Sequence, residues 1–182
     1  MHIRNFKPTD LAEIVEILNY YVKNDACIFQ VEPYLIEEID AKFKSITPKY
    51  PFFVQEHKGK VVGFAYGARW RDKPAYAQSV ETTIYVHPDY KHSGIGEPLY
   101  RKLIDTLTEM NFHLLVAGMT MPNPGSQRLH EKLGFEKVGE FKDAGMKFGK
   151  WHNVGFWQKV LKWSLLSFVL KLIEKIPLNP PL

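Results

Sequence analysis

The chain has 182 residues, of which 45% are hydrophobic and 24% charged, so it is long enough to bury the core of one domain. A formal net charge of +4 at pH 7 is too small to indicate an obligate nucleic-acid-binding protein, so no nucleic acid partner is expected. The single cysteine, Cys27, excludes an intramolecular disulfide and a cysteine-rich zinc site. No apolar run reaches the roughly 18 residues of a membrane-spanning helix, and the polar N-terminus lacks a signal-peptide core. The composition predicts a soluble cytoplasmic protein.

The first half of the chain alternates strand-like and helical patterns. Apolar residues recur at helical spacing after Pro8–Asp10, whereas Ser79–Val86 is rich in β-branched residues and has no glycine. In chain order we expect a strand at 3–6, a helix opened by Pro8, a helix at 35–46, a hairpin of strands at 52–56 and 61–66, a loop at 68–77 and a strand at 79–86.

The second half continues this alternation. We expect a helix at about 97–110, a strand at 114–117, a short helix at 126–133, and strands near 136–141 and 153–160. Strands both before and after the helices predict an α/β (α+β) fold with a mixed central sheet and helices on both faces.

The last segment, 161–182, has a different pattern. Its few polar residues lie within roughly a 100° arc of a helix, and three prolines end the chain. We therefore divide the chain into a domain at 1–160 and a C-terminal amphipathic helix with a proline-rich end at 161–182. Such a broad apolar surface needs cover, from the same domain, a second subunit or a membrane surface. A membrane is the least favoured of the three because the polar arc has few cations.

The residues between the strand at 79–86 and the next helix form a turn with two glycines, Gly94 and Gly96. Glycines allow backbone amides to point into a concavity, and the helix that follows adds the positive end of its dipole. This combination suits an anion, best a pyrophosphate, although a Gly-x-Gly turn alone is equally compatible with a simple tight turn. A Rossmann fingerprint requires a third glycine where Leu99 stands, and neither Gly-Lys pair is followed by the Ser or Thr of a Walker loop.

Two motifs nevertheless resemble one known family. Lys91-His92-Ser93-Gly94-Ile95-Gly96 is similar to the pyrophosphate loop Gln/Arg-x-x-Gly-x-Gly/Ala of the GNAT N-acetyltransferases. Asn123–Phe135 resembles the segment Asn-x-x-(Ser/Ala)-x-x-Leu-Tyr-x-Lys-x-Gly-Phe of the same family. Within it the chain is most similar to the phosphinothricin and methionine sulfone acetyltransferase group, through Ser79–Pro88, Leu129–Phe135 and Lys147-Phe148-Gly149-Lys150-Trp151.

The resemblance covers about 1–160 and implies the GNAT fold, with acetyl-CoA as co-substrate and direct transfer of the acetyl group to a primary amine. The implied acceptor is small and amino-acid-like, as phosphinothricin and methionine sulfone or sulfoximine are. Because the family often dimerises, we expect a homodimer, with the C-terminal helix at or near its interface. The histidines show no metal-ligand spacing, and no metal is expected.

The resemblance also implies which residues bind acetyl-CoA. The main chain at 84–86 is expected to pair with the pantetheine arm and to polarise the thioester. Lys132 is expected to meet the 3′-phosphate, although a solvated helix lysine is the commoner case. The complete predicted set is Ile84, Tyr85, Val86, Lys91, His92, Ser93, Gly94, Ile95, Gly96, Glu97, Asn123 and Lys132.

Two residues are candidates for proton transfer. Glu81 is an unexpected charge inside a strand; it either faces solvent or, as the resemblance implies, removes the proton of the amine through a water that Thr82 and Thr83 help to order. His130 stands where many relatives have a tyrosine that protonates the leaving thiolate, and it is either a general acid or a structural residue.

The acceptor is expected to meet Trp70, Arg71, Tyr76 and Phe29, together with Glu81. An arginine binds a carboxylate or phosphinate with two hydrogen bonds, and Arg71 is favoured over Arg69. Cys27 is not expected to be a nucleophile, because the family transfers the acetyl group directly. Two other functions stay open: acetylation of a peptide, protein or polyamine amine, and a non-catalytic CoA-binding role.

Overall fold

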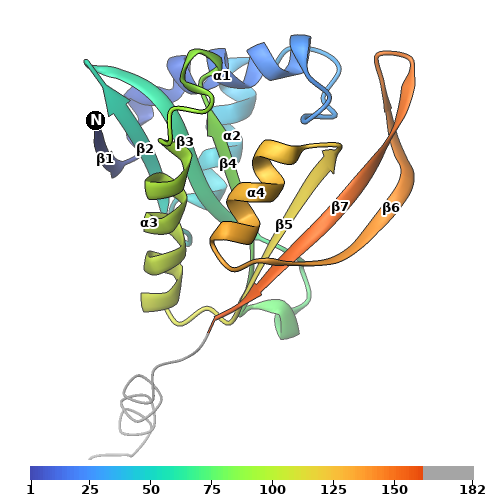
Figure 1. Ribbon diagram of the computed structural model, residues 1–182. Helices are drawn as coiled ribbons and strands as arrows, with labels where there is room; N and C mark the ends of the chain where they lie inside the picture. Colours follow the sequence, from blue (N-terminus) through green and yellow to red (C-terminus); the bar gives the residue numbers. More distant parts are fainter. Residues whose placement is uncertain (162–182) are drawn as a thin grey trace, which may run out of the picture.

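A computed structural model describes residues 1–161, so the predicted C-terminal helix lies outside the described residues. The described chain forms one mixed seven-stranded sheet, in the order β1-β2-β3-β4-β5-β7-β6, with helices on both faces (Figure 1). This arrangement confirms the predicted mixed α/β fold. The elements are β1 (His2–Asn5), α1 (Leu11–Asn24), α2 (Ile36–Ile46), β2 (Phe52–His57), β3 (Lys60–Arg69), β4 (Ser79–Val86), α3 (Gly96–Glu109), β5 (Leu114–Met121), α4 (Pro124–Lys132), β6 (Glu136–Lys147) and β7 (Lys150–Val160).

Several strands are longer than predicted, because each is paired with its neighbour over its whole length. β5 continues past Ala117 to Met121, since β7 pairs with it from Leu114↔Val160 to Met121↔Asn153. β6 and β7 form one long hairpin that turns at Phe148 and Gly149, both of which have positive φ. β3 likewise extends to Arg69 along β4.

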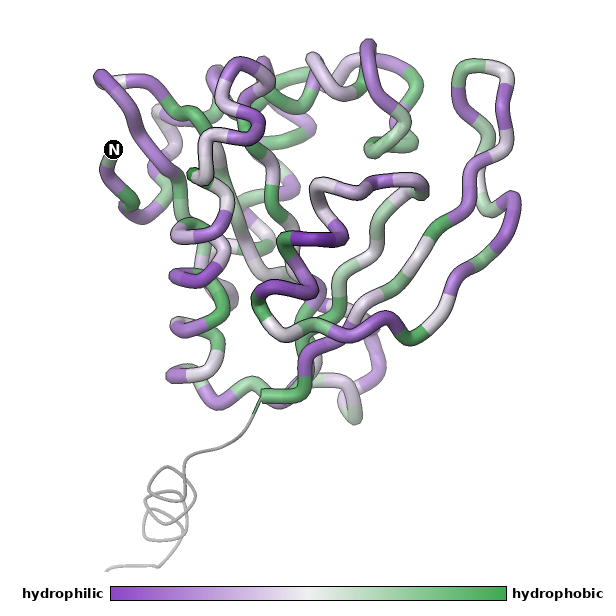
Figure 2. Tube along the Cα trace, viewed as in Figure 1, coloured by the Kyte–Doolittle hydropathy of each residue, from purple (hydrophilic) through white to green (hydrophobic). Residues whose placement is uncertain are grey.

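The core has two parts, one on each face of the sheet. Successive residues of a strand point to opposite faces, so Phe52 and Val54 pack with α1 and α2 while Phe53 packs with α3. In α3 the buried residues are Leu99, Tyr100, Leu103, Ile104 and Leu107, at helical spacing. Figure 2 shows hydrophobic and hydrophilic residues alternating along α3, as expected of a helix with one buried side.

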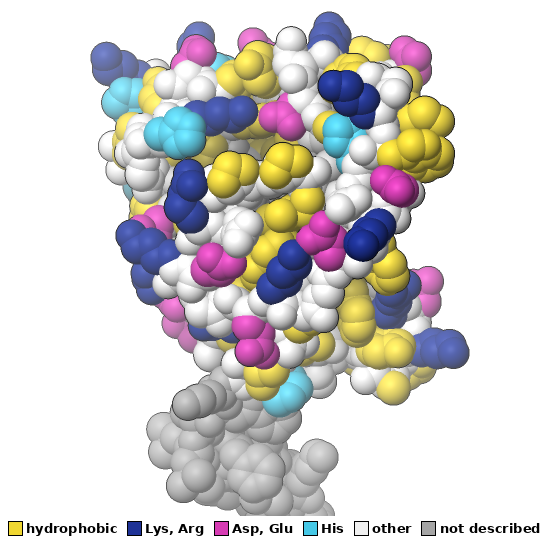
Figure 3. Space-filling view, turned by 45° about the vertical axis from the view of Figure 1, so that its right-hand side comes forward, with side chains coloured by type: hydrophobic (Ala, Val, Ile, Leu, Met, Phe, Trp, Pro, Cys, Tyr) yellow, Lys and Arg dark blue, Asp and Glu magenta, His cyan; other side chains and the backbone are white. Residues whose placement is uncertain are grey.

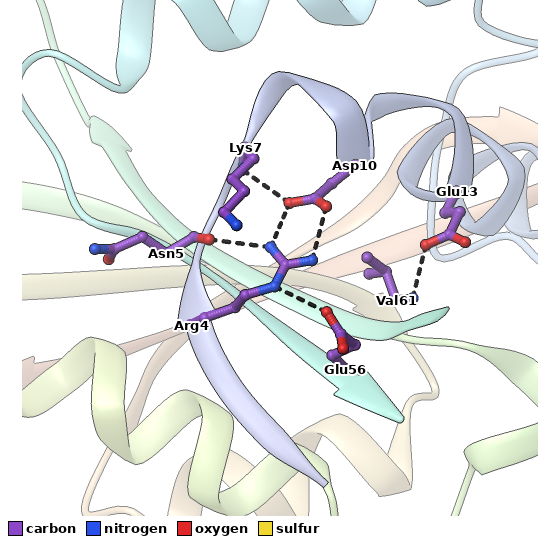
Figure 4. A network of polar contacts seen from close by, with 7 residues as sticks. All are labelled: Arg4, Asn5, Lys7, Asp10, Glu13, Glu56 and Val61. Carbon is purple, nitrogen blue, oxygen red and sulfur yellow. Dashed lines mark hydrogen bonds and ion pairs between the residues drawn. The ribbon is translucent and has the colours of Figure 1, made fainter. Parts of the chain in front are cut away.

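A polar network fixes the N-terminus to the sheet (Figure 4). Arg4 donates two hydrogen bonds to the carboxylate of Asp10, at 2.8 and 2.9 Å, and one to Glu56 at 2.9 Å. The backbone N–H of Lys7 also donates to Asp10 at 2.8 Å. Burial raises the pKa of Asp10, but the bonds from Arg4 and Lys7 outweigh it, so that the pKa lies below its usual value.

β4 and β5 are parallel, yet they pair only over Ser79↔Leu114, Val80↔Leu115 and Glu81↔Val116. Beyond this point β4 remains paired with β3, and β5 with β7, so the two strands separate toward their carboxyl ends. The facing edges of β4 and β5 therefore offer backbone N–H and C=O groups that the sheet does not use. The functional site lies in this opening.

Candidate active site

A cavity of about 690 Å³ occupies the opening between β4 and β5. Most of the residues predicted to bind the cofactor line it, together with both predicted catalytic residues. They are Glu81, Ile84, Tyr85, Val86, Lys91, His92, Gly94, Ile95, Gly96, Glu97, Asn123 and His130. Six predicted residues are not among its lining residues: Ser93, Lys132, Phe29, Trp70, Arg71 and Tyr76.

The turn before α3 has the geometry of an anion cradle. His92 has φ 64° and Gly94 has φ 80°, so the backbone turns through the left-handed region twice before α3 begins at Gly96. A Cβ at Gly94 would meet nothing within 4 Å, which leaves that side of the turn open to a ligand. Ser93 is not among the lining residues, and its hydroxyl donates to the carbonyl of Tyr90 at 2.6 Å. Backbone amides beside the N-terminus of α3 suit a pyrophosphate.

Asn123 stands at the start of α4 on the opposite side of the cavity. Its Oδ1 accepts a hydrogen bond from the N–H of Ser126 at 3.1 Å and so caps the helix. Within residues 1–161 its amide NH₂ group has no hydrogen-bond acceptor, and Asn123 lines the cavity. Asn123 can therefore cap α4 and donate to a bound ligand at the same time.

The two cations of α4, Arg128 and Lys132, have different surroundings in the structure. Nζ of Lys132 lies 2.6 Å from Oε2 of Glu97, and Lys132 is not in the wall of the cavity. Arg128 lines the cavity and forms no ion pair or hydrogen bond with the described part of the chain. The sequence analysis missed Arg128, although it lies four residues before Lys132 and hence on the same side of the helix.

His130 belongs to a buried hydrogen-bond network. Its Nδ1 lies 2.8 Å from the carbonyl oxygen of Ser126, which can only accept, so Nδ1 carries the proton. Nε2 lies 3.0 Å from the hydroxyl of Tyr100, which lies 2.6 Å from Oγ1 of Thr82. Burial lowers the pKa of His130, so the ring is neutral at neutral pH. Both ring nitrogens are thus occupied by protein partners.

The hydroxyl of Thr82 belongs to this network and not to the face of β4 that carries Glu81. Neighbouring residues of a strand point to opposite faces, so Thr82 is buried against Tyr100 and accompanies His130 rather than the carboxylate. Thr82 nevertheless lines the cavity, so the expectation that it helps to order a water for Glu81 stays a prediction. Thr83, on the same face as Glu81, lines the cavity.

Glu81 reaches solvent in the cavity, yet the protein around it affects its ionisation. Desolvation raises the pKa of Glu81, while the nearby charges of Lys42 and Arg71 oppose that rise; the net shift is upward. Arg71 acts on this carboxylate although it lies outside the wall of the cavity. A carboxylate with a raised pKa, placed where the two strands separate, can accept a proton near neutral pH.

Apart from Glu81, the predicted acceptor residues lie in two places, neither of them in the wall of the cavity. In the loop between β3 and β4, the rings of Trp70 and Tyr76 meet edge-on, with their centroids 5.2 Å apart. The guanidinium of Arg71 lies over the Trp70 ring, with its Cζ 5.3 Å from the ring centroid. Arg69 instead faces Asp72 at 3.5 Å. Phe29 lies elsewhere, against the β6–β7 hairpin, where a Cβ on Gly145 would come within 2.5 Å of the Phe29 ring.

Three lining residues come from a part of the chain to which the sequence assigned no such role: Tyr21, Asp25 and Cys27. The hydroxyl of Tyr21 donates to the carbonyl of Val86 at 2.6 Å, which ties α1 to the end of β4. Asp25 lies 3.8 Å from Lys91. Burial raises the pKa of the Cys27 thiol to about 12, so the thiol is protonated and a poor nucleophile.

Comparison with known proteins agrees with this architecture. Residues 3–154 match the model of the acetyltransferase (GNAT) domain, and the chain belongs to the GNAT acetyltransferase family. It is 36% identical to phosphinothricin N-acetyltransferase from Streptomyces viridochromogenes, over 87% of each chain. It is 34% identical to an L-methionine sulfoximine/L-methionine sulfone acetyltransferase from Salmonella typhimurium, over 87% of this chain and 93% of that one.

A solved structure has a sequence identity to this chain close to that of these relatives. The phosphinothricin acetyltransferase of Sinorhizobium meliloti in complex with AcCoA superimposes with a TM-score of 0.86 at 32% identity, over 91% of this chain and 90% of that one. Among residues 1–161 there is no helix long and apolar enough to cross a membrane. Nor do those residues contain a group of three or more His, Cys, Asp or Glu side chains placed to hold a metal ion.

Proposed function

We propose that this chain is an acetyl-CoA-dependent N-acetyltransferase that acts directly on the primary amine of a small amino-acid-like acceptor. One observation carries the proposal: the strands β4 and β5 separate to form a cavity that has a glycine-rich anion cradle at one end and Glu81 on its wall. The similarity to enzymes named for phosphinothricin, methionine sulfoximine and methionine sulfone supports this class of acceptor.

In this proposal the chain binds acetyl-CoA along β4. The amides around Gly94 and the N-terminus of α3 hold the pyrophosphate, and the free edge of β4 from Ile84 to Val86 pairs with the pantetheine arm. The NH₂ group of Asn123 donates from the other side. Arg128, rather than Lys132, is the α4 cation available to the 3′-phosphate, because Lys132 is already paired with Glu97.

The thioester supplies an activated acetyl group, and the protein's part is to prepare the amine. An ammonium group has no lone pair, so it must lose a proton before it attacks the thioester carbon. Glu81 removes that proton, directly or through a water, and amides of β4 stabilise the developing negative charge on the carbonyl oxygen. The C–S bond then breaks as the carbonyl re-forms, and the nitrogen loses its second proton, which the departing CoA thiolate takes up. His130 acts as a positioning residue for α4, since both of its ring nitrogens are engaged.

Cations near Glu81 support an acceptor that carries a negative group. Arg71 and Lys42 both act on the Glu81 carboxylate, and Arg71 is held over the ring of Trp70. An amino acid has a carboxylate close to its amine, whereas a polyamine has only positive groups. Two cations near Glu81 therefore favour an amino acid over a polyamine as the acceptor.

The test is release of CoA thiol from acetyl-CoA with a panel of acceptors. We expect phosphinothricin, methionine sulfone and methionine sulfoximine to be better acceptors than spermidine or lysine-containing peptides. A preference for polyamines or peptides would indicate the alternative acceptor class. Thiol release that no amine stimulates would indicate a CoA-binding protein without transferase activity.

We also propose a homodimer and a cytoplasmic location, where acetyl-CoA is available. Exposed apolar side chains on the β6–β7 hairpin support self-association; Figure 3 shows hydrophobic side chains on this side of the molecule. They are Val138, Phe141, Met146, Phe148, Trp151 and Val160. Sedimentation of the full chain and of Phe141→Lys tests this: the wild type should sediment as a dimer and the variant as a monomer.

A further inference from the structure

Lys147 is a buried lysine that no step of the proposed reaction uses. It stands at the end of β6, beside the tip of the β6–β7 hairpin, and only 4% of its surface is exposed. No carboxylate forms an ion pair with it among residues 1–161. Its Nζ instead donates to two backbone carbonyls, of Asp25 at 2.9 Å and of Ile28 at 2.7 Å.

These two bonds hold the loop that follows α1 against the hairpin, across more than a hundred residues of sequence. Burying an ammonium group is costly, and strong hydrogen bonds are needed to offset that cost. Phe29 reinforces the contact, because its ring packs directly on Gly145 of β6. In Figure 1 the hairpin rises to the level of this loop.

The loop held by Lys147 forms part of the cavity wall. Asp25 and Cys27 both line the cavity, and each lies at or between the two anchored carbonyls. From the other side, Lys91 in the pyrophosphate turn lies 3.8 Å from the Asp25 carboxylate. The loop therefore lies between two lysines, one from the anion cradle and one from the hairpin.

We infer that Lys147 is a positioning residue that holds the Asp25–Ile28 loop in place as a wall of the cavity. This inference rests on the proposed function. Acetyl-CoA has its own anchors in the glycine turn and at Asn123, whereas the acceptor depends on the closure of the remaining wall. This inference gives a structural role to the motif at the hairpin tip, Lys147-Phe148-Gly149-Lys150-Trp151. The motif places the Lys147 side chain against the loop.

Cys27, as the only cysteine of the chain, reports on the loop without any need for activity. We expect Lys147→Met to raise the rate of Cys27 alkylation by iodoacetamide by about tenfold, because the released loop opens more often. Loss of the Lys147 charge alone would slow the alkylation. Lys147 lowers the pKa of Cys27, so removing it leaves less of the reactive thiolate. Faster alkylation therefore identifies loop release.

The KM values show whether the substitution affects binding of the acceptor or of acetyl-CoA. Lys147→Met should raise the acceptor KM by about tenfold while changing the acetyl-CoA KM much less, and Lys147→Arg, which keeps the donors, should restore part of the loss. Lys150→Met is the matched control, since Lys150 is exposed in the same hairpin; it should leave both the alkylation rate and the KM values unchanged.

Unchanged Cys27 alkylation in Lys147→Met would overturn the inference. The inference would also be overturned if the KM values for the acceptor and for acetyl-CoA rose equally and the melting temperature fell, because these changes indicate only a structural role. Should the wild type transfer no acetyl group, the proposed function fails, whereas the alkylation rates still test whether Lys147 holds the loop. Should Lys147→Met not fold, Lys147→Arg decides. Faster Cys27 alkylation together with a raised acceptor KM supports the inference, whereas an unchanged alkylation rate, or a raised acetyl-CoA KM alone, contradicts it.

Discussion

The hydroxyl of Tyr100 lies 3.0 Å from Nε2 of His130, and this contact joins α3 to α4 inside the protein. Because Nδ1 of His130 donates to a backbone carbonyl, Nε2 must accept its hydrogen bond from Tyr100. The histidine that the family resemblance suggested as a general acid is therefore neutral and fully bonded. We interpret it as a support for the wall of the cavity.

Tyr100→Phe tests this interpretation of His130. The substitution removes the hydrogen bonds of the Tyr100 hydroxyl to His130 and to Thr82 and leaves the Nε2 acceptor buried without a partner, which should cost about 1–3 kcal/mol of stability. If His130 only positions α4, turnover at saturating substrate should change by less than about threefold and its pH dependence should keep its shape. A lost basic limb in the pH profile of Tyr100→Phe or of His130→Asn would instead assign proton transfer to this pair.

The conformation of Gly94 gives a second prediction. Gly94→Ala places a Cβ on a residue with φ 80°, which strains the turn and moves the amides that we propose bind the pyrophosphate. Loss of one hydrogen bond to a charged group should weaken acetyl-CoA binding by about tenfold or more, measured by calorimetry.

Gly59→Ala is the control for Gly94→Ala, because Gly59 also has positive φ, 78°, but lies in the β2–β3 turn, outside the cavity wall. Both variants should lose similar stability, and only Gly94→Ala should lose affinity for acetyl-CoA. Equal affinities in the two variants would exclude the turn as the pyrophosphate site.

A third prediction concerns the two cations of α4. If Arg128 binds the 3′-phosphate, Arg128→Gln should weaken acetyl-CoA binding by about tenfold and leave 3′-dephospho-acetyl-CoA unaffected. Lys132→Gln breaks the surface ion pair with Glu97 and should preserve the preference of the protein for the phosphorylated form. The reverse pattern, with Lys132→Gln abolishing that preference, would restore the assignment made from sequence.

The local parts of the fold could be predicted, and the contacts between distant parts could not. The strand Ser79–Val86 and the turn with Gly94 and Gly96 are encoded by neighbouring residues, so their patterns were sufficient. The choice between Arg128 and Lys132 depends on Glu97, in another helix, which neutralises one of them. No pattern along the chain could have revealed that partnership.

The opposite orientations of Glu81 and Thr82 are a different case. Alternation along a strand places Glu81 and Thr82 on opposite faces, and this information was present in the sequence. The role of Lys147 was hidden, because its partners are backbone carbonyls of a loop near the other end of the chain. Backbone acceptors have no residue signature, so only the structure shows the contact.

Asp10 gives a prediction for the dependence of stability on pH. Its pKa is lower in the folded state than in the unfolded chain, so it contributes stability above the unfolded pKa of about 4, and that contribution is lost as the pH falls through the folded pKa. Asp10→Asn should destabilise the protein by about 2 kcal/mol at pH 7 in urea unfolding. The difference from wild type should shrink below about pH 4; a difference that does not depend on pH would contradict the role of the Arg4–Asp10 pair.

The central claim, direct acetyl transfer with Glu81 as the base, is tested most directly by Glu81→Gln. This variant keeps the shape of the side chain and removes its basicity. With methionine sulfone as acceptor, turnover at pH 7 should fall by about 10² or more, while the affinity for acetyl-CoA stays the same. The wild-type rate should also decline at acid pH with an inflection above the ordinary glutamate value of about 4.3, because desolvation raises the pKa of Glu81, and the variant should lack this inflection. Full turnover by Glu81→Gln at pH 7 would contradict the account.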